Sequence, residues 1–271
     1  MKHILCLAIA VFLCGTLHAV SLPSNVVCIS IVVREFKESA INRLYTVPST
    51  NNFYASIGAS TNMSVLLANA CASRLSISET LTSISKSAKQ DELIVLHIFG
   101  HGFLQYNDLY FAPWDVDVRN LLGTGISFKQ ILCVLLDMCQ RGANVIAVLD
   151  ISDASAAIYN INEFTTVNGG ISFLTACSPG ETLYDFYGGG YDFSASICEA
   201  LNGQADENND SLITLREVYD YALRRSHEAN IEINMVYNKI NKQETKHSPD
   251  FRVPEPVLFG TLRSDIVLNS N

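Results

Sequence analysis

Short apolar runs separate longer stretches of mixed polarity along most of this chain. The runs have the length and the residue types of strands that are buried on both faces of a parallel sheet. They cover residues 25–33, 93–102, 145–149 and 170–176, with shorter runs at 109–113 and 257–259. Each run predicts one strand.

The stretches between these runs contain helix patterns with recognisable starts and stops. Ser76 with Glu79, and Ser127 with Gln130, have the spacing of capping boxes, so we expect helices to begin at both places. The second of these helices is expected to stop at Gly142. Further helices are predicted at 61–72, 193–201 and 215–226. Strands that alternate with helices predict an α/β fold, with a mostly parallel central sheet and helices on both faces.

Two of the predicted strands end in residues that carry chemistry. The run at 93–102 ends in Gly-His-Gly, where the glycines permit a sharp turn that exposes the imidazole of His101. The run at 145–149 is followed by Asp150 and, two residues later, by Ser152. Open α/β sheets bind ligands at the carboxyl ends of their strands, so His101 and Ser152 form a candidate two-residue site. A histidine satisfied within a loop is the alternative interpretation of His101 by itself.

Composition narrows the class of protein. With 271 residues, 48% of them hydrophobic, the chain fits one well-filled domain, which we place at residues 25–268. The formal net charge is −9 and no basic cluster occurs, which argues against a nucleic-acid partner. Residues 1–19 combine a basic start, an apolar run and a small residue for cleavage, the pattern of a secretory signal peptide. We expect a secreted or periplasmic protein with no membrane span once the signal is removed.

The cysteines beyond the predicted signal do not indicate a metal site. Cys28, Cys71, Cys133, Cys139, Cys177 and Cys198 include no CxxC pair and no Cys/His cluster. An even count in an exported protein permits disulfides. Most of these cysteines lie in apolar stretches, however, which favours buried free thiols.

A series of segments, taken in order, resembles one known family. The resemblance rests on FGHG at 99–102, LYFAPWDVD at 109–117, GISFKQILCVLLDMCQ at 125–140, VIAVLD at 145–150, FLTACSPGETLYD at 173–185, GGGYDFSASICEALNGQAD at 188–206, NNDSLITLREVYDYA at 208–222 and PEPVLFG at 254–260. These segments resemble the catalytic domain of caspase-like and metacaspase-like cysteine peptidases. The resemblance spans essentially the whole chain beyond the signal and implies the caspase-haemoglobinase fold.

The resemblance also implies roles for three residues. The family's histidine general acid lies where His101 lies here, and its nucleophilic cysteine lies at Ser152, two residues after Asp150. In metacaspase-like members the matching aspartate lines a pocket for basic side chains, so Asp150 implies a preference for Arg or Lys ligands. Apart from the resemblance, Asp150 reads equally well as the cap of the turn after its strand.

A serine at the nucleophile position changes the expected chemistry. A thiol supplies a thiolate after a modest pKa shift, whereas a serine hydroxyl needs a closely bound general base. The carboxylate of Asp153 also opposes the negative charge that develops at an oxyanion site. We therefore expect a catalytically degenerate peptidase that binds basic peptides or acts through protein contacts. The alternative is an active endopeptidase using Ser152 with His101, and Cys177 is a further candidate nucleophile. A Cys-to-Ser change introduced to trap the protein would not explain Asp153 or Ser155.

A twelve-residue loop has the ligand spacing of an EF-hand. Oxygen donors fall at positions one, three, five, seven, nine and twelve, the seventh being a backbone carbonyl: Asp206, Asn208, Asp210, Leu212, Thr214 and Glu217. Position six is Ser211, where the EF-hand turn prefers glycine. Thr214 and Glu217 also form a capping box, which explains these two residues without a metal. Both interpretations stay open, and the first would make the chain a calcium-dependent interaction module. A second acidic pair, Asp115 and Asp117, is interpreted as a solvated loop.

Overall fold

The computed structural model describes residues 25–41, 53–56, 61–157, 168–178, 180–181, 192–240, 253–262 and 264–270. At its centre is a six-stranded sheet with the strand order β10-β8-β7-β3-β1-β2. Neighbouring strands are parallel, except that β10 is antiparallel to β8. The strands are β1 (Val26–Val32), β2 (Thr61–Ala68), β3 (Leu93–Phe99), β7 (Asn144–Asp150), β8 (Ile171–Thr175) and β10 (Val257–Gly260). The predicted, mostly parallel sheet is confirmed.

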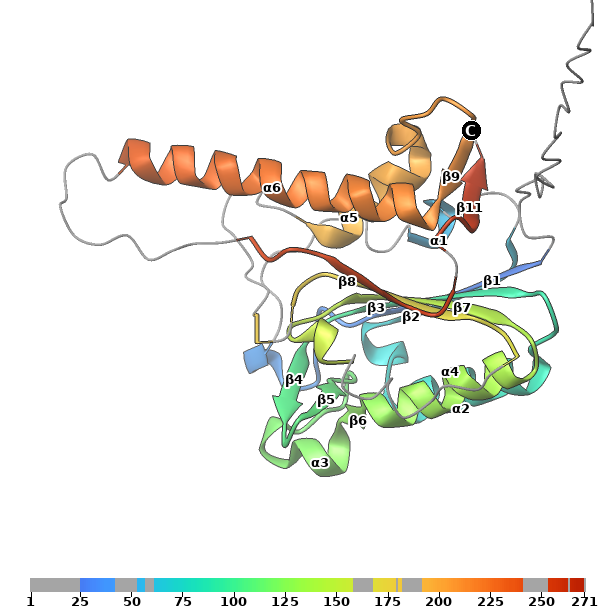
Figure 1. Cartoon of the computed structure of the whole chain (residues 1–271). Coiled ribbons are helices and arrows are strands. Elements are labelled where there is room, and N and C mark those ends of the chain that lie inside the picture. The colour runs from blue at the N-terminus through green and yellow to red at the C-terminus, as the bar shows by residue number, and fades with distance from the viewer. Residues whose placement is uncertain are drawn as a thin grey trace, which may run out of the picture.

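Helices cover both faces of this sheet (Figure 1). One face carries α2 (Arg74–Ser87) and α4 (Phe128–Gln140), and the other carries α1 (Phe53–Ser56), α5 (Phe193–Glu199) and α6 (Leu215–Ile240). An apolar cluster fills the space between helices and sheet on each face. Successive residues of a strand point to opposite faces, so a strand such as β3 must be apolar at nearly every position.

The helix starts follow the predicted caps at α4 but not at α2. Ser127 Oγ accepts the N–H of Gln130, and the Gln130 side chain accepts the N–H of Ser127, which completes the predicted capping box. The capping box predicted at Ser76 is wrong. Helix α2 begins earlier because Ser73 is its N-cap, with its Oγ accepting the N–H of Ser76.

The segment 61–72 is largely a strand, and the helix predicted there is wrong. β2 covers Thr61–Ala68 and pairs in parallel with β1 at the edge of the sheet. The segment contains leucine, alanine and methionine, which favour helices in isolation. The edge of β1 offers backbone partners that a local preference does not take into account, and this tertiary pairing decides the structure.

Two small antiparallel sheets accompany the central one. β4 (Gly102–Gln105), β5 (Asp108–Phe111) and β6 (Ile126–Ser127) form the first, and β9 (Leu212–Thr214) pairs with β11 (Val267–Ser270) in the second. Only β5 was predicted. The others are short, and their pairing depends on partners that are distant in sequence or on the Tyr106-Asn107 turn between β4 and β5.

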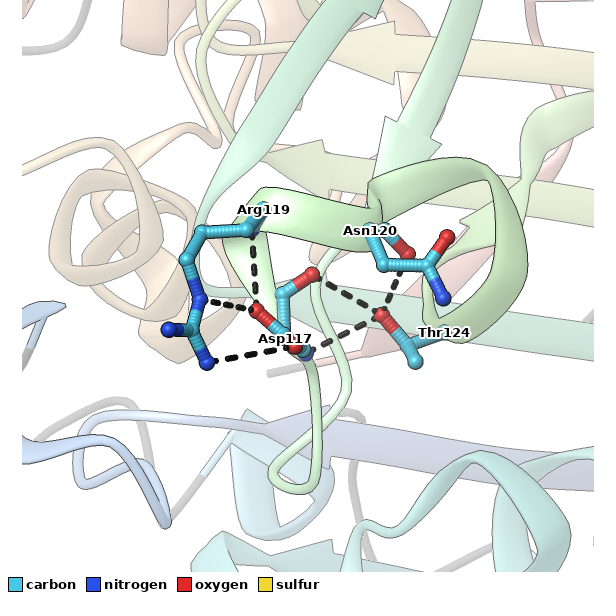
Figure 2. A network of polar contacts seen from close by, with 4 residues as sticks. All are labelled: Asp117, Arg119, Asn120 and Thr124. Atoms are coloured by element: carbon cyan, nitrogen blue, oxygen red, sulfur yellow. Dashed lines mark hydrogen bonds and ion pairs between the residues drawn. The ribbon is translucent and has the colours of Figure 1, made fainter.

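The acidic loop at 115–117 has a structural role. Asp117 Oδ1 accepts the backbone N–H of Arg119 at 3.0 Å and the Nε–H of the Arg119 guanidinium at 3.1 Å (Figure 2). These hydrogen bonds lower the pKa of the Asp117 carboxyl group. Thr124, the last residue of the short helix α3 (Leu121–Thr124), accepts the N–H of Asp117 through its Oγ1 in the same network. Asp115 Oδ1 accepts the N–H of Arg74 at the start of α2. These carboxylates therefore order the chain locally.

Three further sequence predictions concern export and the cysteines. The predicted signal at 1–19 lies outside the described residues. Within the described residues, no helix combines the length and the apolar character that a membrane crossing requires. The six cysteines beyond the predicted signal are all free, and four of them are buried, as their apolar surroundings predicted.

Candidate functional site

His101 lies in the turn between β3 and β4, with its side chain partly exposed. Its Nε2 is 2.7 Å from the carbonyl oxygen of Ile41. Because a carbonyl oxygen only accepts, Nε2 carries the hydrogen, and Nδ1 is then the acceptor of the neutral ring. The ring stacks on Phe36 at a centroid distance of 5.3 Å and lies against Phe103 at 6.1 Å. These contacts orient the imidazole at the edge of the sheet.

Ser152 lies at the same edge, in the turn after β7, and is also partly exposed. Strands β3 and β7 are adjacent and parallel, and the N–H of Gly100 donates to the carbonyl oxygen of Asp150 at 3.3 Å. A Cβ at Gly102 would lie 2.2 Å from the carbonyl oxygen of Ser152, so only glycine lets the two chain segments approach this closely. The structure therefore brings the His101 and Ser152 turns together.

Asp153 locks the turn that contains Ser152. It has a φ of 58°, in the left-handed region that aspartate adopts more readily than most residues. Its N–H donates to the carbonyl oxygen of Glu181 at 3.0 Å, and its Oδ1 accepts the N–H of Gly180 at 3.0 Å. Burial raises the pKa of its carboxyl group. The N–H that follows Ser152 is thus bound by Glu181 and is not directed at a substrate oxyanion.

Asp150 ties the end of β7 to the start of α5. Only 4% of the residue is exposed, and its Oδ2 accepts two hydrogen bonds from Ser194. One comes from the backbone N–H at 3.1 Å and the other from the hydroxyl at 2.6 Å. The carboxylate therefore has a fixed orientation next to the Ser152 turn.

Comparison with known proteins identifies the architecture. The sequence matches no protein-family model and no curated protein. Caspase-1 from Spodoptera frugiperda is similar in structure, with a TM-score of 0.54 and 12% identity over 92% of this chain and 90% of that one. Protein GSU0716 from Geobacter sulfurreducens is similar with a TM-score of 0.54 and 10% identity, over 88% of this chain and 93% of that one. This chain has a caspase-like fold.

The caspase-like fold is the one that the sequence resemblance implied. In this fold, as in other parallel sheets, adjacent strand ends bring residues distant in sequence to one edge. A shared fold does not assign a role to any residue. The roles predicted for His101, Ser152 and Asp150 therefore stay predictions.

Cys177 is a buried structural thiol in this caspase-like fold. The residue is fully buried, and its Sγ lies 3.4 Å from the carbonyl oxygen of Ile151. Burial raises the pKa of the thiol to about 12, with smaller contributions from the carboxylates of Glu181, Asp153 and Asp150. Such a thiol carries almost no thiolate near neutral pH, which argues against Cys177 as a substitute nucleophile.

A buried polar chain behind Asp150 was missed by the sequence analysis. His97 Nε2 lies 3.0 Å from Ser194 Oγ, and His97 Nδ1 lies 2.9 Å from Ser30 Oγ. The His97 ring is fully buried and stacks on Phe53 at a centroid distance of 4.1 Å. Burial lowers its pKa to about 3, so the ring is neutral. A signal was present in the sequence, because His97 and Ser30 interrupt two otherwise apolar runs and lie opposite each other in the sheet.

In the loop at 206–217, carboxylate oxygens accept hydrogen bonds from backbone N–H groups of the same loop. Asp206 accepts the N–H of Asp210 through Oδ1 and the N–H of Ser211 through Oδ2, both at 3.1 Å. Ser211 has a φ of 66°, the left-handed conformation for which the sixth position of an EF-hand prefers glycine. Glu217 Oε2 accepts the N–H and hydroxyl of Thr214 at 2.9 and 2.8 Å. The capping box predicted at these two residues is present.

Two further residues of the predicted ligand set take part in contacts of the protein itself. Asn208 Oδ1 also accepts the N–H of Asp210, and Leu212 belongs to β9, which pairs with β11. Within the described part of the chain, no group of three or more His, Cys, Asp or Glu side chains is arranged to hold a metal ion. Calcium binding by this loop stays a prediction.

Proposed function

We propose that this caspase-like chain is an exported protein without cysteine-peptidase activity that binds basic peptides where β3 and β7 end. The observation that carries the proposal is the turn at Ser152. By the sequence resemblance, Ser152 stands where the family has its nucleophilic cysteine. Asp153 adds a carboxyl group next to it in the chain, and the Asp153 N–H donates to the carbonyl oxygen of Glu181. Each feature works against formation of an oxyanion at this turn.

The charges around the turn support a basic ligand. Asp150 and Asp153 flank the turn at Ser152 in the chain, and the carbonyl oxygen of Glu181 accepts the N–H of Asp153 at 3.0 Å. No ion pair recorded between described residues involves Asp153 or Glu181. The ligand that complements a cluster of carboxylates is a cationic side chain, with arginine favoured because its guanidinium pairs with a carboxylate through two hydrogen bonds.

An active serine endopeptidase is the second candidate, and the tautomer of His101 favours it. The Ile41 carbonyl holds the hydrogen on Nε2, so Nδ1 of the neutral ring is the acceptor that a general base requires. A base alone does not complete such a site, because the transition state also needs donors for the oxyanion. The Asp153 N–H is engaged elsewhere.

Peptide hydrolysis distinguishes the two candidates. The protein without its predicted signal is incubated with a library of Arg- and Lys-containing peptides, with and without calcium, beside Ser152→Ala and His101→Ala. We expect the three proteins to show the same background turnover. Turnover by the unmodified protein that both substitutions abolish would establish the serine endopeptidase instead.

Calorimetry tests the binding part of the proposal. A capped peptide with one arginine should bind more tightly than its citrulline counterpart, which has nearly the same shape and no charge. Binding should weaken with salt and with Asp150→Asn. The control is Glu79→Gln, which removes an exposed carboxylate on α2, far along the chain from the proposed site. Equal affinities for the arginine and citrulline peptides would contradict the proposal.

A further inference from the structure

The hydrogen bonds behind Asp150 run in one direction. Ser194 donates its N–H and its hydroxyl to the same oxygen of Asp150, an arrangement that suits an ionised carboxylate. Since the Ser194 hydroxyl hydrogen points to Asp150, Ser194 Oγ can only accept from His97, and His97 Nε2 carries the ring hydrogen. His97 Nδ1 then accepts from the hydroxyl of Ser30. Every donor in the chain is therefore directed toward Asp150.

The chain connects Asp150 to the centre of the sheet. Ser30 lies on β1, His97 on β3 and Ser194 on α5, and all three are fully buried. Phe53 stacks on the His97 ring with an interplanar angle of 13°, which restricts ring rotation. A charged group that is fixed by buried partners loses little freedom when it meets a ligand. The turn after β7 alone would not hold the carboxylate in this way.

We propose that His97 and Ser194 are positioning residues that hold the Asp150 carboxylate for a cationic side chain. This inference rests on the proposed function and adds to it the groups that set specificity for a basic ligand. Neither residue touches the ligand. Both act through Asp150, so their loss should weaken binding of a charged peptide much more than binding of its neutral counterpart.

Three substitutions separate positioning from ordinary core packing. Ser194→Ala removes the hydroxyl donor and keeps the backbone N–H. His97→Phe keeps a ring against Phe53 and removes the donor to Ser194. His97→Gln is the conservative variant, because its side-chain amide can reach Ser194 with an N–H near the position of Nε2. Circular dichroism and thermal unfolding establish which variants are folded.

The readout is the affinity for the arginine peptide relative to the citrulline peptide, measured by calorimetry. We expect Ser194→Ala and His97→Phe to lower this ratio about tenfold, the scale of one hydrogen bond to a charged group. His97→Gln should restore most of the ratio. If His97→Phe does not fold, Ser194→Ala decides the question, because it removes a single oxygen atom.

The outcomes separate this inference from the proposed function. If the unmodified protein prefers the arginine peptide and Asp150→Asn abolishes the preference, the basic-ligand site stands. An unchanged ratio in folded Ser194→Ala would then overturn the positioning role alone. An equal loss in His97→Phe and His97→Gln would also overturn the role of the His97 donor. No preference in the unmodified protein would overturn both proposals.

Discussion

The interior of β3 and the turn at its end each contain a histidine, and the two have opposite environments. His97 is fully buried, and both of its ring nitrogens are bound by serine hydroxyls. His101 is partly exposed and is oriented by the carbonyl of Ile41. Only three positions separate a side chain enclosed between sheet and helices from one at the edge where the strands end. Burial and partners, and not residue type, therefore decide what a histidine can do here.

The difference has a physical origin in the sheet. Inside β3, both faces are covered by helices, and a charged imidazole would lose its hydration without an anionic partner. Burial accordingly lowers the pKa of His97 to about 3. Beyond Phe99 the strand ends, and the chain turns at Gly100 and Gly102 into β4. An imidazole in that turn keeps access to water and to ligands.

The largest effect is expected from deleting each histidine in turn. His97→Ala should lower the free energy of unfolding by roughly 4 kcal/mol, because it leaves a cavity and two buried hydroxyls without their partner. His101→Ala should cost about 1 kcal/mol or less, since its site is partly exposed. Urea denaturation measures both values. Equal losses of unfolding free energy would contradict the difference in burial and hydrogen bonding between His97 and His101.

The pH dependence of stability sharpens the same contrast. His97 is neutral in the folded protein down to about pH 3, whereas in the unfolded chain it gains a proton near pH 6.5. Its contribution is therefore fully present above pH 6.5 and is lost as the pH falls toward 3. Between pH 7 and pH 5 the loss should be roughly 2 kcal/mol. His97→Gln, which does not titrate, should remove this part of the slope, and an unchanged slope would contradict the neutral buried state.

A smaller effect is expected when the comparison is extended from histidines to carboxylates. Asp150 is buried and bound by Ser194, whereas Asp206 is bound by backbone N–H groups of an exposed loop. Calcium should bind the folded loop better than the unfolded one, so calcium on the order of 10⁻⁴–10⁻³ M should raise the melting temperature. We expect a rise of about 3 °C, measured by calorimetry, at calcium well above the dissociation constant.

Two substitutions control the calcium experiment. Asp206→Ala should abolish the shift, because it removes the first ligand position. Asp115→Ala should lower the melting temperature, because it removes the acceptor for the N–H of Arg74 at the start of α2, and should leave the calcium shift intact. A melting temperature that is indifferent to millimolar calcium would leave the loop structural, with Thr214 and Glu217 explained by their capping box.

The central strands were predictable, whereas the edges were not. β1, β3, β7 and β8 are buried on both faces, so each leaves a nearly continuous apolar run in the sequence. β2 lies at the edge with an irregular burial pattern, and its residues locally favour a helix. β9 and β11 form only because distant segments meet. Local pattern identifies a strand where both faces are covered, and it fails where pairing alone defines the strand.

By itself, the sequence determined that His101 and Ser152 lie at strand ends, that these ends belong to one parallel sheet, and that a caspase-like fold connects them. The strand ends and the parallel sheet follow from apolar runs and turn residues, which are local, whereas the caspase-like fold follows from the resemblance to a known family. The tertiary structure alone decided that the Asp153 N–H is bound by Glu181, that Cys177 is buried, and that Ser30, His97 and Ser194 support Asp150. These contacts join segments far apart in the chain, and hydrogen-bond partners are selected by distance and direction in space, which no linear pattern encodes.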